Sequence, residues 1–181
     1  MKITRSLIQE KRAAFGYHRQ SWGQFASALA RPLLTVQRTV PLGGLGIQAV
    51  ANRAIHKLSQ VGGLGRYADL TSGPGFGRAI ANIVAQLRLE QIGPDALTLL
   101  APDVRSLLQA YERELAEHGF TDWPGILRAA ASAATDPGSR NRLLGIPTLL
   151  LDVPLTGFRH WPPPSILLPQ SRDPRFQLVM Q

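Results

Sequence analysis

Four successive stretches of this sequence place apolar residues at the spacing of an amphipathic α-helix, and this periodicity constrains the fold most. Residues that recur every three or four positions lie on one face of a helix. Glycine or proline follows most of the stretches, as expected where a helix ends. The stripes run from Ile47 to Val61, Phe76 to Leu87, Val104 to Leu115 and Ile126 to Ala134. The sequence therefore predicts a mainly α protein with a helical bundle.

Weaker signals precede these helices. Residues 2–13 favour a short amphipathic helix, and residues 14–20 read as extended chain. Ser21 is a suitable N-cap for a further helix over 22–30, which we expect to stop at Arg31-Pro32. Residues 33–40 fit either a strand or a connector.

The pattern changes after residue 145. Ile146 to Leu151 is an almost continuous apolar run that ends at Asp152, which is typical of a buried strand in a parallel sheet. Prolines then dominate, with Pro162-Pro163-Pro164 at their centre. We therefore predict a helical part over 1–155, with one or two short strands, and an irregular, poorly ordered tail over 156–181.

Composition excludes several classes of protein. The chain of 181 residues has no cysteine, so disulfides and thiolate metal sites are excluded. It has no apolar run of the roughly eighteen residues that a membrane span requires, and its N-terminus lacks the apolar stretch of a signal peptide. The simplest expectation is a cytoplasmic protein without a membrane partner.

The positive charge bears on the choice of partner. Twenty Lys and Arg against twelve Asp and Glu give a net charge of +8, and arginine supplies most of it. Arginine pairs with phosphates and stacks on bases, so this excess favours a nucleic-acid partner. The alternative is a solvated surface without such a role, since the charges form no block.

Motifs for catalysis are incomplete. No lysine follows the glycines at 43–46, 62–65 and 73–77, so these are not a phosphate loop, and we interpret them as helix ends. The four histidines lack metal-ligand spacing, so no metal site and no cofactor are predicted. Asp152 fits either the remnant of a magnesium-binding strand-end acid or an ordinary capping residue.

Several segments together resemble a known family. Phe15 to Ala26 is similar to the strand and helix that follow the first motif of helicase-like domains. Residues 74–80 with 87–89, and residues 107–116, resemble a helical insertion, and residues 148–155 complete the order. Over residues 14–155 the sequence resembles the N-terminal, helicase-like part of bacterial PD-(D/E)XK nuclease family proteins. These are relatives of an ATP-dependent helicase/nuclease subunit used in the repair of double-strand breaks.

The resemblance implies a superfamily-1-like fold, whose helical insertion lies between a phosphate-loop strand and an Asp-bearing strand. Asp152 would be the relic of that acid. The phosphate-loop strand, the second helicase-like domain and the nuclease of the family are missing. We therefore expect a fragment of a truncated or frame-shifted gene, with residues 156–181 translated in the wrong frame.

Two functions follow as hypotheses. The first is a fragment of a DNA-repair helicase/nuclease subunit, with non-catalytic contacts to DNA and a helicase/nuclease partner subunit. Its candidate phosphate contacts lie on or beside helix surfaces, and they are Arg19, Arg53, Arg78 and Arg88. The second is a helical protein–protein interaction module without a nucleic-acid role. A standalone enzyme is disfavoured, since no nucleophile–base pair or metal cluster is visible.

Overall fold

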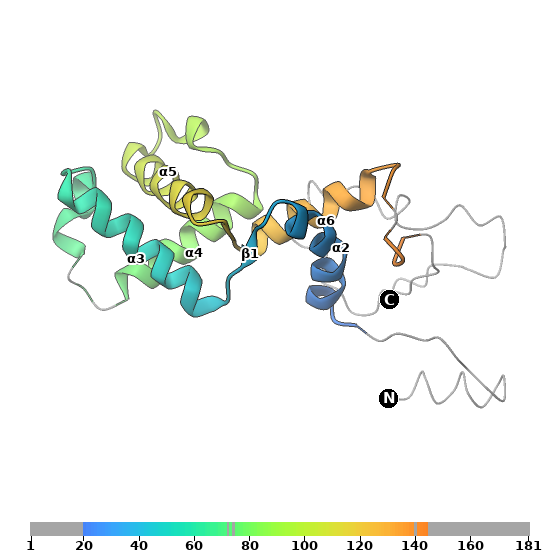
Figure 1. The fold of residues 1–181 in the computed structure, drawn as a ribbon. Coiled ribbons are helices and arrows are strands. Elements are labelled where there is room, and N and C mark those ends of the chain that lie inside the picture. Colours follow the sequence, from blue (N-terminus) through green and yellow to red (C-terminus); the bar gives the residue numbers. More distant parts are fainter. Residues whose placement is uncertain (1–19, 72, 74, 140, 145–181) are drawn as a thin grey trace, which may run out of the picture.

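The computed structural model describes residues 20–71, 73, 75–139 and 141–144, and this part of the chain is mainly helical (Figure 1). The mainly α prediction is confirmed for these residues. The predicted helix over 2–13, the predicted strand at 146–152 and the tail at 156–181 lie outside the described residues. The elements, in order, are α2 (Trp22–Val36), β1 (Val40–Pro41), α3 (Gly44–Gln60), η1 (Gly65–Leu70), α4 (Phe76–Leu89), η2 (Pro94–Leu97), α5 (Pro102–Glu117), β2 (Phe120–Thr121) and α6 (Trp123–Thr135).

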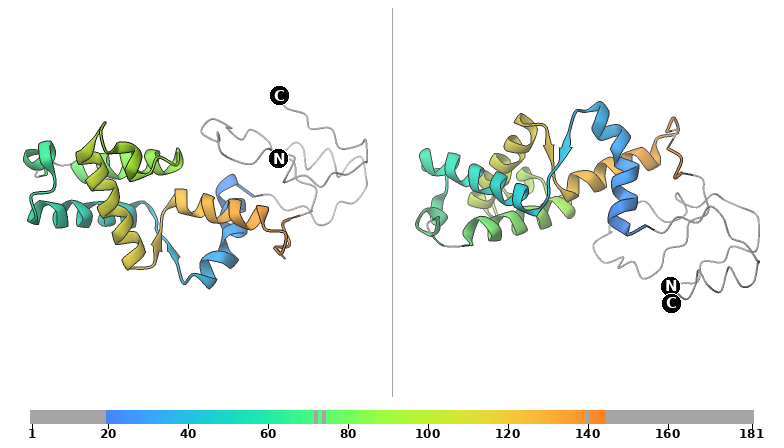
Figure 2. Two further views of the ribbon diagram at one scale, coloured as in Figure 1. Left: turned by 90° about the horizontal axis from the view of Figure 1, so that it is seen from above. Right: turned by 60° about the horizontal axis from the view of Figure 1, so that its bottom comes forward.

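The helices form two lobes, and Figures 1 and 2 show these lobes on opposite sides of the described structure. The three-helix lobe consists of α3, α4 and α5, and it buries the predicted apolar stripes against one another. Its most deeply buried large side chains are Val84, Leu107, Leu108 and Tyr111. The two-helix lobe consists of α2 and α6, with residues 141–144 packed against them.

A short parallel sheet lies between the lobes. β1 pairs with β2, so that Val40 lies beside Phe120 and Pro41 beside Thr121. The amide of Val40 donates to the carbonyl of Gly119 at 2.8 Å, and that of Leu42 donates to Thr121 at 2.8 Å. Since β1 directly precedes α3 and β2 directly follows α5, the chain enters and leaves the three-helix lobe at one place.

Gly119 makes this pairing possible. Its φ of +63° is a left-handed conformation, and a β-carbon there would come within 3.2 Å of the Arg38 carbonyl oxygen. Gly119 directly follows the C-cap of α5, His118, so it also marks the end of that helix. The strand pair itself is not evident in the sequence, because two-residue strands carry no alternation.

Helix α2 begins as predicted but ends later. The Ser21 hydroxyl accepts from the Gln24 amide at 3.2 Å, and the Gln24 side chain accepts from the Ser21 amide at 2.9 Å, which completes a capping box. The predicted stop at Arg31-Pro32 is wrong, since the helix continues through Pro32 to Val36.

The continuation past Pro32 is supported by a residue that lies far away in the sequence. Proline has no amide hydrogen, so the carbonyl of Ala28, four residues earlier, loses its helical donor. The Asn141 side-chain amide donates to the carbonyls of Ala28 and Leu29 at 3.4 Å each. A residue from beyond α6 therefore provides the hydrogen bond that proline cannot.

The four stronger helices agree with the predicted stripes to within a few residues, and Gly62 and Gly75 adopt positive φ beside helix ends. Within the described residues, each helix is too short or too polar to cross a lipid bilayer.

Candidate functional site

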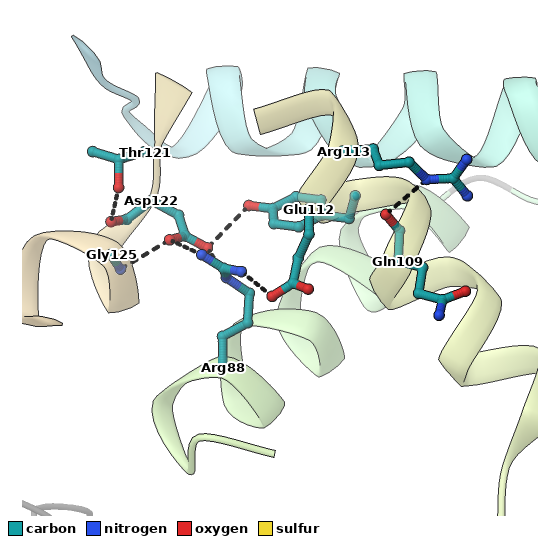
Figure 3. Close-up of polar contacts among 8 residues, drawn as sticks. Arg88, Gln109, Glu112, Arg113, Thr121, Asp122 and Gly125 are labelled. Atoms are coloured by element: carbon teal, nitrogen blue, oxygen red, sulfur yellow. Dashed lines mark hydrogen bonds and ion pairs between the residues drawn. The ribbon is translucent and has the colours of Figure 1, made fainter. Parts of the chain in front are cut away.

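A densely connected polar group in the described chain surrounds Arg88 in the last turn of α4 (Figure 3). Its side chain is only 7% exposed, and it reaches toward the carboxylate of Asp122. Arg88 Nε lies 2.8 Å from Asp122 Oδ2, and Arg88 Nη2 lies 3.2 Å from Oδ1. Glu112 approaches Nη1 from the other side. The guanidinium is thus held by two carboxylates.

Asp122 connects three helices. It is the N-cap of α6, where its Oδ1 accepts from the Gly125 amide at 3.0 Å. The Tyr111 hydroxyl of α5 donates to Oδ2 at 3.3 Å, and Arg88 approaches from α4. The carboxylate is 2% exposed, so these groups replace the water that it would otherwise bind. We call Arg88, Tyr111, Glu112 and Asp122 the Arg88 network.

The electrostatics of the Arg88 network favour a fixed charge distribution. Burial lowers the pKa of Arg88, but the hydrogen bond and charge of Asp122 outweigh it, so the pKa lies above its ordinary value. Burial and the charge of Asp122 raise the pKa of Tyr111. Burial, with the nearby Arg88 charge, lowers the pKa of Arg128. Because Arg88 is paired with Asp122 and Glu112, we interpret the network as a structural contact between helices and not as a site of proton transfer.

A second polar group lies on the other face of α5, around Glu114. This carboxylate is 2% exposed and contacts Arg53 Nε at 2.8 Å and the Lys57 ammonium, both from α3. Lys57 also contacts Glu117 at 3.2 Å. These hydrogen bonds raise the pKa of Lys57 and lower that of Glu117. Glu112 and Glu114 are two residues apart on α5 and contact different helices, so they form no paired-carboxylate site.

Glu114, Glu117 and His118 have ligand atoms within 4.8 Å of one another, which is a spacing that a metal ion could span. Two cations, Arg53 and Lys57, already neutralise these carboxylates. A divalent ion would have to displace Lys57 and would be repelled by Arg53. We therefore interpret the group as a set of ion pairs that joins α3 to α5.

The four predicted phosphate contacts have different surroundings. Arg78 is exposed on α4, and the Arg53 side chain is 57% exposed while paired with Glu114. Arg88 is buried in its network, so in this conformation its guanidinium is closed to a phosphate. Arg19 and the strand-end acid Asp152 lie outside the described residues.

The net charge is unevenly distributed along the chain. The described residues contain eleven Lys and Arg against nine Asp and Glu. Only +2 of the total of +8 therefore belongs to this part of the chain. Most of the positive charge that favours a nucleic-acid partner lies in residues 1–19, at residue 140 and in residues 145–181.

Two hollows on the described surface are wide and shallow. One follows α2 and is lined by Ser21, Gly23, Gln24, Ser27, Ala28 and Arg31. The other lies on α5, beside Glu112 and Arg113. A small-molecule site is usually concave and mostly enclosed, and neither hollow has that form.

Comparisons with protein-family models, with curated proteins and with solved structures found no match to this chain.

The Arg88 network is not predicted from the sequence, although one signal for it is present there. Arg88 continues the apolar stripe of α4, four residues after Val84, which itself follows Ile80 by four. A charged residue on a core-facing stripe requires a buried partner of opposite charge. The position of that partner, 34 residues later, has no local signature.

Proposed function

We propose that this chain is part of a DNA-repair helicase/nuclease subunit, in which the three-helix lobe is a non-catalytic helical insertion that contacts DNA phosphates. The observation that carries the proposal is the course of the chain. The two-helix lobe is built from segments before and after the three-helix lobe, and β1 and β2 lie side by side where the chain passes between them. An inserted lobe has this arrangement, and the family resemblance implies a helical insertion that includes residues 74–80, 87–89 and 107–116, which lie largely in α4 and α5.

The polar chemistry of the lobe supports a non-catalytic role. Two acids of the described residues are buried, Glu114 in the lobe and Asp122 at its border with α6, and each is held by cations. A general acid or base must be open to a substrate, and neither of these groups is exposed. Neither buried acid is therefore open to a substrate, which supports DNA contact without catalysis.

Arg78 is the residue best placed for a phosphate contact on this surface. It is exposed on α4, and no ion pair is found for it among the described residues. Arg53 is half exposed but would share its charge with Glu114. A phosphate contact releases counterions, so each one adds about 1 to the slope of log affinity against log salt.

The test is a titration of the full chain with duplex DNA over a range of salt concentrations. We expect Arg78→Ala to weaken binding and to reduce the salt slope by about 1. Arg31→Ala removes another exposed arginine, from α2 in the other lobe, and serves as the matched control. Salt-independent binding, an absence of binding at low salt, or equal effects of the two variants would contradict the proposal.

A helical protein-interaction module is the second candidate, and one observation favours it. Leu99 and Leu100, in the connection before α5, are adjacent and are 93% and 85% exposed. Contiguous exposed apolar residues often mark a protein contact. Light scattering of the eluting protein with and without duplex DNA separates the candidates: a DNA-independent oligomer supports this one, and a monomer that shifts with DNA supports the first.

A further inference from the structure

The two-helix lobe has an incompletely covered apolar face. Its seam is formed by small residues that bring α2 and α6 close together, with Ala26, Ala30 and Ala130 fully buried. Larger side chains border the seam and are only partly buried, and they include Phe25, Leu33, Trp123 and Leu127. A layer of two helices normally needs another layer to cover such residues.

The chain that follows α6 already begins to cover this face. The Asn141 side chain is held at the carbonyls of Ala28 and Leu29 in α2, at 3.4 Å each. Its Oδ1 accepts from the Leu143 amide at 3.0 Å, which fixes the turn. Leu143 and Leu144 then pack against the α2–α6 cluster. The chain is thus returned to α2 with apolar residues directed onto its face.

From this arrangement we infer that Ile146 to Leu151 docks on the α2–α6 face and completes the core of the two-helix lobe. The segment begins two residues after Leu144, and residues 143–151 carry no charge. Four of its six side chains are large and apolar: Ile146, Leu149, Leu150 and Leu151. Six extended residues span about 20 Å. The fifteen residues of α2 span about 22 Å, so the lengths match.

The tests below distinguish this segment from three other occupants: the N-terminal segment around Leu7, a second copy of the chain, or a different protein. The segment at 146–151 is favoured because Leu143 and Leu144, which precede it, already pack on the face. Gln20 and Ser21, which follow the N-terminal segment, are exposed instead. The tether of the 146–151 segment to α2, through Asn141, also occupies the backbone position that Pro32 leaves without a donor.

The first test compares hydrogen exchange in two variants of the full chain. Leu149, Leu150 and Leu151 are replaced by serine in one, and Ile166, Leu167 and Leu168 in the other. We expect the first variant to exchange its α2 and α6 amides at least about tenfold faster, while the α3–α5 amides stay protected by their separate core. The second variant should exchange like the unmodified chain. Equal behaviour of the two variants would overturn the inference.

The second test uses the absence of cysteine in the chain, and it does not depend on how the serine variants fold. Leu33→Cys is combined with Thr148→Cys, and separately with Leu7→Cys, in the full chain. Oxidation should close a disulfide within one molecule for the first pair and leave the second pair open. Closure of the Leu7 pair alone, or disulfides formed only between molecules, would assign the face to the N-terminal segment or to a second copy. Two pairs that both stay open would exclude the docked segment.

Discussion

The guanidinium of Arg88 forms a two-point contact with the carboxylate of Asp122, through Nε–Oδ2 at 2.8 Å and Nη2–Oδ1 at 3.2 Å. Two parallel bonds fix both distance and orientation, which a single bond does not. Because Arg88 lies in the last turn of α4 and Asp122 caps α6, this pair sets how the two lobes meet, together with the β1–β2 pair.

Replacing Asp122 by asparagine should destabilise the protein strongly. Arg88 would remain buried without its main counter-charge, and the loss of one partner from a buried pair costs about 3 kcal/mol. The free energy of unfolding, measured with urea, should fall by this amount. Asp69→Asn makes the same change at an exposed acid and should leave the free energy unchanged within about 0.5 kcal/mol. Comparable losses of unfolding free energy in the two variants would show that the Arg88–Asp122 pair contributes no more to stability than an exposed acid does.

Tyr111 should make stability depend on alkaline pH. Burial, with the charge of Asp122, raises the pKa of its phenol above the ordinary value of 10.0. The unfolded state therefore releases this proton first, and the stability that is present below about pH 10 is lost as the pH rises further. Tyr111→Phe should flatten this decline, at a cost of about 1 kcal/mol near neutral pH from the lost hydrogen bond.

Tyr67→Phe is the control for this measurement, and it should leave the alkaline decline in place. Absorbance titration gives a second readout, since one of the three tyrosines should stay protonated until the protein unfolds. A decline that persists in Tyr111→Phe would contradict the prediction.

The ion pairs around Lys57 should contribute to stability between two pH limits. The hydrogen bond with Lys57 lowers the pKa of Glu117 from its ordinary 4.5, so its contribution is present above pH 4.5 and is lost as pH falls through the lowered value. The hydrogen bond with Glu114 raises the pKa of Lys57 from 10.5, so that contribution is present below pH 10.5 and fades as pH rises through the raised value.

Lys57→Met should therefore reduce the acid-side slope of the free energy of unfolding, and high salt should reduce the difference between the variant and the unmodified chain. Lys11→Met removes a lysine from residues 1–19 and provides the comparison. An unchanged acid slope in Lys57→Met would mean that the contacts of Lys57 with Glu114 and Glu117 have no energetic effect.

Leu99 and Leu100 should control self-association without contributing to stability. Their exposed side chains bury little area within the chain, so replacing both by serine should change the free energy of unfolding by less than about 0.5 kcal/mol. The variant should lower the apparent mass seen by light scattering at high protein concentration. Val61→Ser, at another exposed apolar position, should not have this effect. If the apparent mass depended on protein concentration in the same way in the Leu99/Leu100 variant and in the unmodified chain, the prediction would be contradicted.

Most helices of the fold could be predicted from local sequence patterns. The stripe from Ile47 to Val61 and those after it predict α3 to α6, because helical periodicity depends on residues three or four positions apart. Ser21 as the cap of α2 and the glycines beside helix ends follow from equally local rules. The Arg88 network could not be predicted from such local patterns. The sequence predicts Arg88 as a surface contact because its neighbours in the chain say nothing of an acid 34 residues away.

The same division applies to the whole chain. By itself, the sequence determined that this protein has amphipathic helices, where most of them begin and end, and that it lacks cysteine-based chemistry. Tertiary structure alone decided that α2 continues past Pro32, that Arg88 is buried and that the three-helix lobe is inserted between β1 and β2. The reason is physical: helix formation is encoded within one or two turns. The partners of a buried charge or of an unmatched carbonyl come instead from segments that only folding brings together.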